Sequence, residues 1–547
     1  MTLTAAGTIG AAFRAAARRW PDRPFLAVPA RAGRGYLPGG WEGTYAACLD
    51  AVADLEARYA TAGYGAGHRV ALMLENRPEH VLHKLALNAL GASVAPVNPE
   101  YRPAEYAYLV DHCRPDLIVT TEAKRALTEA AVAEASHRPP TAQLEDFAGT
   151  PGHAPRRAEG DGPDPAREAS LLYTSGTTGR PKGCVMSHEY ELAMGDWYAS
   201  RGGVAAFGEG TDRVFNPLPL YHVNAGIMSL FGVMSRGNCL IVDDRFHPST
   251  WWADVAATGA TVVHYLGVIA SMLMKRPEER RDRAHAVRFG FGAGIEPTLH
   301  DAFERRFGFP MVELWGMTEG CRILADAHEP RQVGTRAIGR PVPGLEVRVV
   351  DREDREAPQG EPGEMTIRHS AGTPRKHFFS GYLDDRRATE EAWRGGWFHT
   401  GDTVVIDPDG MIHFVDRAKN IIRRSGENIS AAEVEAVLLE HAAVAQVAVA
   451  PLPDELREEE VLACVVAAEG AEAGAALAED IARHCLGRLA YYKAPGWVLF
   501  LDALPTTGTQ KIQKHRLFAD GEDPRERPGM HDLRALKKRG APPGERT

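Results

Sequence analysis

The sequence predicts an α/β protein with a large N-terminal domain of doubly wound α/β subdomains, a small antiparallel β unit, and a small mobile C-terminal α+β domain. Three observations support this prediction. The chain has 547 residues, which is more than one hydrophobic core usually organises. Short apolar runs alternate with helical stretches as far as Trp315, and the apolar period changes to two after Gly344.

The first half of the chain has the rhythm of strands and helices in a doubly wound sheet. Residues 69–97 form a strand-helix-strand pattern, and further short apolar runs follow at residues 117–120, 171–174, 261–266, 288–291 and 311–315. Ligands of such sheets bind outside the carboxyl ends of the strands. We therefore expect the loops after Tyr173, Phe291 and Trp315 to face one cleft.

The second half predicts two smaller units. Residues 347–367 and 404–415 alternate apolar and polar side chains, as antiparallel strands do. Farther on, Ser430 and Glu433 have the spacing of a capping box at a helix start. The predicted divisions are a large N-terminal domain at 1–416, a small C-terminal domain at 417–520, and a charged, flexible tail at 521–547.

Composition limits the partners and the compartment. The net charge is -10 and no dominant basic face is evident, so nucleic acid is not an expected partner. The seven cysteines are scattered without C-x-x-C spacing, which favours a reducing cytoplasm over a disulfide framework or a zinc site. No uncharged apolar run reaches the length of a membrane span. Residues 1–20 predict an amphipathic helix, with an organellar transit segment as the alternative.

Residues 173–183, Tyr-Thr-Ser-Gly-Thr-Thr-Gly-Arg-Pro-Lys-Gly, follow a predicted strand and favour phosphate binding. Glycines let the backbone approach an anion, while hydroxyls and an ammonium share its charge. The lysine precedes Gly183 instead of Ser or Thr, which excludes a Walker A loop. A surface loop without a ligand is the alternative. The residues expected at phosphate are Thr174, Ser175, Gly176, Thr177, Thr178, Gly179 and Lys182.

This run resembles the phosphate loop of the adenylate-forming superfamily, which includes acyl-CoA synthetases, nonribosomal peptide adenylation domains and beetle luciferases. The segment Trp315-Gly316-Met317-Thr318-Glu319 is similar to a second motif of that family. The resemblance implies that Thr318 contacts the α-phosphate of ATP and that Glu319 holds Mg²⁺. A single carboxylate is sufficient because phosphate oxygens supply other ligands. A solvated Glu at a strand end is the alternative.

Two further segments match the family's nucleoside site. The loop Gly292-Ala293-Gly294 is expected against the adenine, with Trp315 on its other side and Gly316 and Met317 nearby. The segment that ends in Asp402 resembles the ribose motif, and Arg417 matches the arginine that assists at ribose or phosphate. An ordinary strand-to-helix turn and a turn aspartate are the alternatives.

The remaining matches concern catalysis and the acyl group. Lys511 aligns with the family's catalytic lysine, although Gln510 stands where relatives usually have Gly, and Lys419 aligns with the hinge. His222 matches the acyl entrance, for which a packed core histidine is the alternative. Two residues are further candidates for the substrate pocket: Tyr265 offers an aromatic face and Arg322 could orient an anionic substrate.

Taken together, the resemblance implies an ATP-dependent acid:CoA ligase, similar to those of the carnitine/crotonobetaine type. Such an enzyme forms an acyl-adenylate with release of pyrophosphate and passes the acyl group to CoA. The alternatives are loading of a carrier protein, amide formation, activation of nitrite for attack by an amine, and a catalytically silent binding module. A homodimer is among the expected assemblies.

Overall fold

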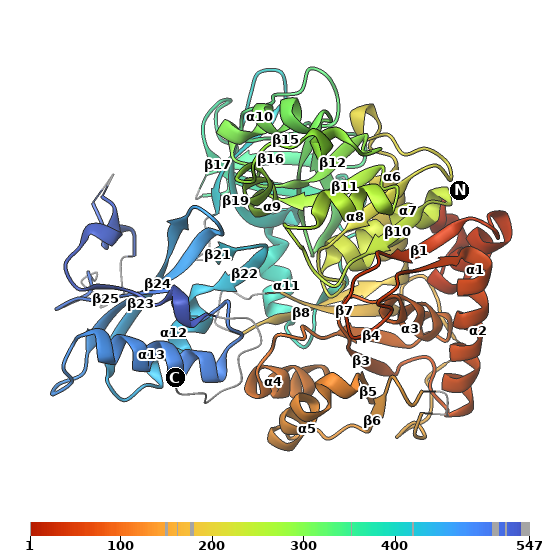
Figure 1. Cartoon of the computed structure of the whole chain (residues 1–547), viewed down its shortest axis with the longest axis horizontal. Coiled ribbons are helices and arrows are strands. Elements are labelled where there is room, and N and C mark those ends of the chain that lie inside the picture. The colour runs from red at the N-terminus through yellow and green to blue at the C-terminus, as the bar shows by residue number, and fades with distance from the viewer. Residues whose placement is uncertain are drawn as a thin grey trace.

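Two sheets with parallel centres form the framework of the large domain, in red to green in Figure 1. The computed structural model describes residues 2–147, 151–160, 162–174, 180–351, 353–417, 421–505, 514–519 and 522–537. The first sheet has the order β14-β13-β12-β11-β9-β10-β1-β2, parallel except for the edge strands β14 and β2. Its strands are β14 (Gly320–Ala325), β13 (Met311–Met317), β12 (Phe289–Ala293), β11 (Val262–Leu266), β9 (Arg213–Asn216), β10 (Cys239–Val242), β1 (Pro24–Val28) and β2 (Trp41–Thr44).

The second sheet has the order β18-β8-β7-β4-β3-β5-β6, and its last five strands are parallel. Its strands are β18 (Gly381–Tyr382), β8 (Lys182–Ser187), β7 (Glu168–Thr174), β4 (Ser93–Pro96), β3 (Arg69–Met73), β5 (Leu117–Thr120) and β6 (Thr141–Gln143). Between β3 and β4 lies α3 (Pro78–Ala89), which starts with proline at its first position, where no backbone donor is needed. This confirms the predicted strand-helix-strand unit.

Helices connect the strands and contribute to one continuous apolar core across both sheets. The predicted opening helix forms as α1, and the transverse helix α6 contacts β7, β8 and β14. The helices of the large domain other than α3 are α1 (Ile9–Arg19), α2 (Tyr45–Thr61), α4 (Pro103–Cys113), α5 (Arg125–Glu134), α6 (His188–Ala199), α7 (Leu230–Arg236), α8 (Trp251–Ala257), α9 (Gly267–Met274), α10 (Pro297–Phe307) and α11 (Arg386–Ala392). The α/β prediction is therefore confirmed.

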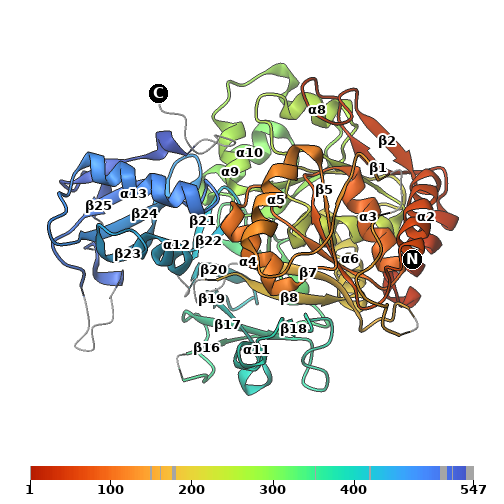
Figure 2. The ribbon, with the colours of Figure 1, turned by 90° about the horizontal axis from the view of Figure 1, so that it is seen from below.

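The predicted antiparallel unit forms a five-stranded sheet that lies along the lower side of the molecule in Figure 2. Every pair in it is antiparallel. Its strands are β15 (Ala337–Gly339), β20 (Ile412–Arg417), β19 (Phe398–Ile406), β17 (Gly363–Arg368) and β16 (Glu346–Val350). Burial along β17 and β19 does not alternate, since residues 365–367 and 398–402 are buried without interruption.

A smaller C-terminal domain, in blue in Figure 1, has its own apolar core and a sheet of order β22-β21-β24-β25-β26, with β23 beside β24. Only the first half of the predicted capping box forms: Ser430 accepts from the Glu433 amide, but Lys493 attracts the Glu433 carboxylate. The elements are β21 (Ile421–Arg424), β22 (Glu427–Ser430), α12 (Ala431–Leu439), β23 (Val444–Asp454), β24 (Glu458–Ala467), α13 (Ala475–Arg488), β25 (Trp497–Phe500) and β26 (Met530–Asp532).

Two further expectations concern the ends of this domain. The boundary at 416/417 stays a prediction, because residues 418–420 lie outside the described residues. The predicted flexible tail needs a correction: residues 522–537 return to the C-terminal sheet and supply β26. Met530 and Leu533 pack against the apolar clusters of this domain, which offsets the polar composition of the segment. Among the described residues, no helix has the length and apolar character needed to cross a membrane.

Candidate active site

A cavity of about 330 Å³ lies where loops of the large domain meet the C-terminal hairpin β21–β22. The predicted cleft forms here, because residues at the ends of β7, β11, β12 and β13 contribute to its wall. Its described lining has a polar part and an apolar part. The predicted site residues in the lining are Thr174, Lys182, His222, Ala293, Gly316, Met317, Thr318 and Glu319.

Thr174 and Lys182 stand opposite each other at the loop end of the β7–β8 hairpin. Because the two strands pair antiparallel, Lys182 at the start of β8 lies beside Thr174 at the end of β7. Both side chains line the cavity. The other predicted phosphate-binding residues, 175–179, lie outside the described residues.

Glu319 is 8% exposed and lines the cavity. Tyr382, a residue that the sequence did not point to, also lines the cavity and contacts both Glu319 and Lys182. The Tyr382 hydroxyl donates to Glu319 Oε1 at 2.8 Å, and the Lys182 ammonium lies 4.8 Å from the centre of the Tyr382 ring. Burial, followed by the charge of Glu319, raises the pKa of Tyr382, so the phenol stays protonated and donates. A carboxylate oriented in this way beside a phosphate loop fits Mg²⁺.

The glycine loop after β12 is held by another missed residue, Glu313. Its carboxylate accepts from the Gly294 amide at 2.8 Å and from the Ile295 amide at 3.2 Å. Gly292 is required, because a Cβ there would meet the Tyr265 carbonyl oxygen at 2.1 Å. The structure places Tyr265 away from the described cavity lining, where its hydroxyl donates to Glu313 Oε1 at 2.5 Å. Tyr265 therefore supports the loop and does not face a substrate.

Trp315 and Asp402 meet behind the cavity wall. The indole Nε1 of Trp315 donates to Asp402 Oδ2 at 2.8 Å, and both residues are buried. Neither belongs to the described lining in this arrangement, although their neighbours Gly316 and Thr400 do. The backbone register pairs Asp402 with Arg417 across β19 and β20, so the two residues expected at the ribose stand side by side.

His222 reaches the cavity from the loop before the π-helix Asn224–Ser229, and it faces the C-terminal hairpin. Its Nε2 lies 3.3 Å from Glu427 Oε2, and the Tyr221 hydroxyl donates to Glu427 Oε1 at 2.9 Å. Burial alone raises the pKa of Glu427, but His222 and the Tyr221 hydroxyl hold it below its usual value. An ionised Glu427 therefore joins the small domain to His222, the residue predicted at the acyl entrance.

Besides Met317 and Ile421, six large apolar side chains line the cavity, from five helices or strands and one loop. Of the polar residues in the lining, Asn224 has its side-chain oxygen already bonded to Asn216 and to buried His264. Arg322, predicted to lie in this pocket, is outside the described lining; it donates to the Lys376 carbonyl and contacts His377 Nδ1 at 2.8 Å. The six apolar residues are Met194, Leu218, Met228, Leu266, Leu314 and Ile323.

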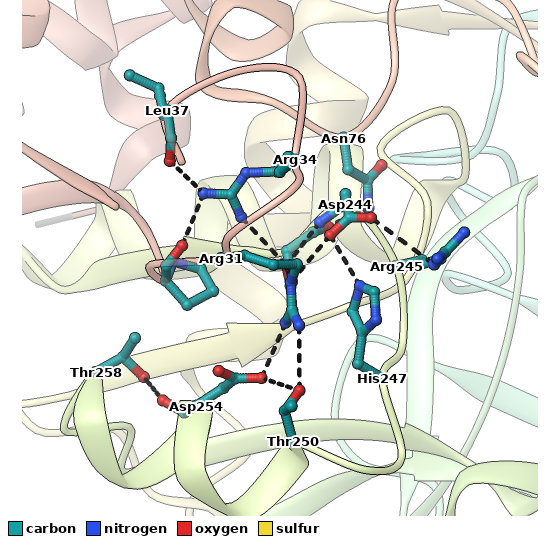
Figure 3. Close-up of polar contacts among 12 residues, drawn as sticks. Arg31, Arg34, Leu37, Asn76, Asp244, Arg245, His247, Thr250, Asp254 and Thr258 are labelled. Carbon is teal, nitrogen blue, oxygen red and sulfur yellow. Dashed lines mark hydrogen bonds and ion pairs between the residues drawn. The ribbon is translucent and has the colours of Figure 1, made fainter. Parts of the chain in front are cut away.

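A polar network fixes the wall that carries His222 (Figure 3). The Asn76 amide donates to the Leu218 and Asp243 carbonyls and accepts from the Leu220 amide, all within 3.1 Å. The Arg31 guanidinium pairs with the carboxylates of Asp243 and Asp254. The ligand atoms of Asp243, Asp244 and His247 lie close enough together to hold a metal ion. The Arg31 guanidinium supplies the positive charge here instead. We interpret the group as an ion-pair network that holds the loops.

Besides residues 175–179, two predicted residues are not placed by the structure. Lys511 and Lys419 both lie outside the described residues. Their roles as catalytic lysine and hinge remain predictions from the resemblance. Arg417 is described in its backbone only.

Comparison with known proteins agrees with this geometry. Residues 13–383 match the family model of the AMP-binding enzyme, and residues 433–511 match the AMP-binding enzyme C-terminal domain. The chain is 31% identical over 519 residues to the sulfoacetate–CoA ligase of Cupriavidus necator, covering 93% of this chain and 97% of that one. It is 28% identical over 471 residues to the crotonobetaine/carnitine–CoA ligase of Proteus mirabilis, covering 83% and 89%.

Two solved structures are also similar. A malonyl-CoA ligase in a ternary product complex with methylmalonyl-CoA and AMP superposes with a TM-score of 0.72 at 28% identity, over 88% of this chain and 97% of that one. The amide bond synthetase McbA from Marinactinospora thermotolerans gives 0.77 at 25%, over 93% and 99%. The chain belongs to the AMP-binding enzyme family, within the adenylate-forming superfamily. It is an enzyme of the ligase class, and the acid:CoA ligation expected from its sequence fits its relatives.

Proposed function

We propose that this AMP-forming acid:CoA ligase activates a carboxylic acid whose acyl part is uncharged and largely apolar, using ATP and Mg²⁺. The observation that carries the proposal is the set of large apolar side chains in the cavity lining, which includes Met194, Leu218, Met228, Leu266, Leu314 and Ile323. A buried charge without a partner costs several kcal/mol, at least about 2, so such a surface selects uncharged groups. Methionines also suit irregular or aromatic groups, since their side chains adapt and contact ring edges.

The first step joins the acid to AMP. A carboxylate oxygen attacks the α-phosphorus, the bond from that phosphorus to the bridging oxygen breaks, and pyrophosphate leaves with the electron pair. Thr174, Lys182 and Thr318 lie on the cavity wall where they would donate to the phosphate oxygens, and Lys182 would offset charge as two anions approach. Mg²⁺, held by Glu319 in the orientation that Tyr382 gives it, would neutralise phosphate charge.

The second step passes the acyl group to CoA. The thiolate attacks the acyl carbonyl carbon, the carbonyl reforms, and AMP leaves as the phosphate. The C-terminal hairpin supports this step, because Ser425, Gly426, Glu427 and Asn428 already line the cavity. The contact between Glu427 and His222 holds the hairpin against the acyl entrance. Lys511 would serve only the first step.

The proposed substrate class differs from those named for two relatives. Sulfoacetate carries a sulfonate in addition to its carboxylate, and carnitine carries a quaternary ammonium. The basic side chains in the described lining are Lys182 on β8, Arg423 on β21, and His222, whose Nε2 already contacts Glu427. Arg322, the best candidate to bind a second anion, is held by a backbone carbonyl and by His377. A sulfonate would therefore lack a partner among the apolar residues.

The test is pyrophosphate exchange with a panel of acids, followed by mass detection of products with and without CoA. Benzoic, branched-chain and medium-chain acids are expected to support exchange and to give CoA thioesters. Preference for sulfoacetate or carnitine would contradict the substrate class. Exchange without a thioester would contradict CoA as acceptor and favour the carrier-protein, amine or nitrite alternatives.

The expected compartment is part of the proposal. All seven cysteines are buried and unpaired in the structure, which supports a reducing cytoplasm. Measurement of free thiols in the purified native protein under denaturing conditions would give seven, whereas disulfide-linked pairs would contradict this location.

A further inference from the structure

Residues 522–537 lie beyond the segment that matches the C-terminal family domain, yet they complete its sheet. β26 pairs antiparallel with β25, with Val498 opposite His531. The Leu533 amide donates to the Gly496 carbonyl at 2.8 Å, and the Arg534 guanidinium lies 4.6 Å from the Trp497 ring centre. The family match ends at residue 511, so this segment lies outside the matched region.

The segment inserts Lys537 into the interior of the small domain. The lysine is 6% exposed, and its ammonium donates to Glu460 Oε1 and, at 3.1 Å, to the Tyr492 carbonyl. Glu460 is fully buried on β24. An ammonium that loses its hydration at a buried site needs hydrogen-bond partners to offset that loss, and here a carboxylate and a carbonyl accept from it. A surface tail would keep its lysines in solvent, so the buried position of Lys537 calls for another explanation.

Glu460 connects Lys537 to the hairpin that closes the cavity. Both Glu460 oxygens accept from Arg424 Nε, at 2.8 and 2.9 Å. Arg424 is the last residue of β21, and the cavity-lining loop follows it directly. The chain turns tightly after Arg424, because the next two residues have left-handed backbone conformations, with a φ of 51° at Ser425 and 88° at Gly426. The position of Arg424 therefore fixes where the turn points.

The second partner of Lys537 leads to the other contact between the domains. The Tyr492 hydroxyl accepts from the Asn98 amide of the large domain at 2.9 Å. The neighbouring Lys493 pairs with Glu105 of the large domain at 2.8 Å and with Glu433 at 2.7 Å. Lys537 thus donates to the backbone of the loop at Tyr492 and to Glu460, the carboxylate that holds the β21–β22 hairpin through Arg424.

We infer that Lys537 is a positioning residue for acyl transfer, which fixes the hairpin Arg424–Glu427 and the loop at Tyr492 in the arrangement that faces CoA. The inference rests on the proposed two-step function, since only the second step uses the hairpin in the cavity. Lys537 touches no reacting atom. Its effect passes through Glu460 and Arg424 to the turn, and through the Tyr492 carbonyl to the contact with the large domain.

The test compares the two half-reactions in the full-length protein after Lys537→Met, which keeps the stem of the side chain and removes the ammonium. The Glu460–Arg424 pair remains, so no isolated buried charge is created. Thioester formation is measured from CoA and a supplied acyl-adenylate of an acid that the wild-type enzyme turns over. Adenylation is measured by pyrophosphate exchange. We expect acyl transfer to fall about tenfold or more, with a raised KM for CoA, and exchange to stay within about twofold.

Arg534→Met is the matched control, because Arg534 lies on the same segment but pairs with Asp532 and Asp454 instead of Glu460. It should leave both half-reactions unchanged. If Lys537→Met does not fold, Lys537→Gln, which keeps an amide donor, is compared in the same way and should show the same split. Equal losses in both half-reactions would show a purely structural role, and no loss in either would also overturn the inference. Absence of thioester formation by the wild-type enzyme would instead contradict the proposed function.

Discussion

Tyr382→Phe tests how the site holds Glu319 for Mg²⁺. The change removes the hydroxyl that donates to Glu319 Oε1 at 2.8 Å and keeps the ring that faces Lys182. A hydrogen bond to a charged group contributes about 1.5–3 kcal/mol. At about 1.4 kcal/mol per factor of ten, its loss corresponds to roughly a 10- to 150-fold change in affinity. Residues that orient a metal ligand have effects of about the same size, 10- to 100-fold.

The assay is pyrophosphate exchange at a fixed ATP concentration while free Mg²⁺ is varied. We expect the half-saturating Mg²⁺ concentration to rise about tenfold or more, because Glu319 loses the donor that orients it. Tyr45→Phe is the control; it removes a buried hydroxyl that donates to the Asn238 carbonyl at 2.9 Å, and neither residue belongs to the described cavity lining. An unchanged Mg²⁺ requirement, or an equal shift in the control, would refute the role assigned to Tyr382.

Three further predictions concern catalysis, the adenine loop and acid stability. Lys511→Ala should abolish pyrophosphate exchange but spare thioester formation from a supplied acyl-adenylate; equal loss of both would reject the assignment. Gly292→Ala should raise the KM for ATP at least about tenfold, because its Cβ would meet the Tyr265 carbonyl, whereas Gly39→Ala has open space and should change nothing. Burial lowers the pKa of His264 to about 3, so its contribution to the free energy of unfolding is present above about pH 6.5 and is lost as the pH falls toward 3. The loss is roughly 2 kcal/mol at pH 5, so His264→Gln should flatten acid unfolding curves in that range; an unchanged slope would contradict a buried neutral His264.

The strands and the β7–β8 hairpin could be predicted because their signals are local. Residues 69–97 show a strand, a helix and a strand in succession, and Thr174 and Lys182 flank one loop of a single hairpin. Periodicity and turn residues are sufficient for features of this kind. The same is true of the antiparallel unit, in which the period of two is visible without knowledge of the partners.

The supports of the site could not be predicted, because they join distant residues by shape. Tyr382 reaches Glu319 across 63 positions, and Glu313 accepts from the Gly294 amide across 19. Tyr265 was expected to face a substrate, but an aromatic residue at a strand end is equally suited to burial, and its hydroxyl is bonded to Glu313. No local pattern shows which side of the wall a side chain occupies.

The tail shows the same limit. Its charges and prolines predict flexibility, yet Lys537 finds buried partners on β24 and at Tyr492. Burial of a lysine depends on carboxylates elsewhere in the fold, and Glu460 gives no sign in the sequence that it will be fully buried. Composition therefore gives the average tendency of the segment and not its position.

The most direct test of acid:CoA ligation is to measure AMP, pyrophosphate and acyl-CoA together in one reaction with ATP, Mg²⁺, CoA and the best apolar acid from the exchange panel. We expect equal amounts of the three products, with AMP release dependent on both the acid and CoA. Formation of ADP, or AMP release without an acyl-CoA product, would contradict it.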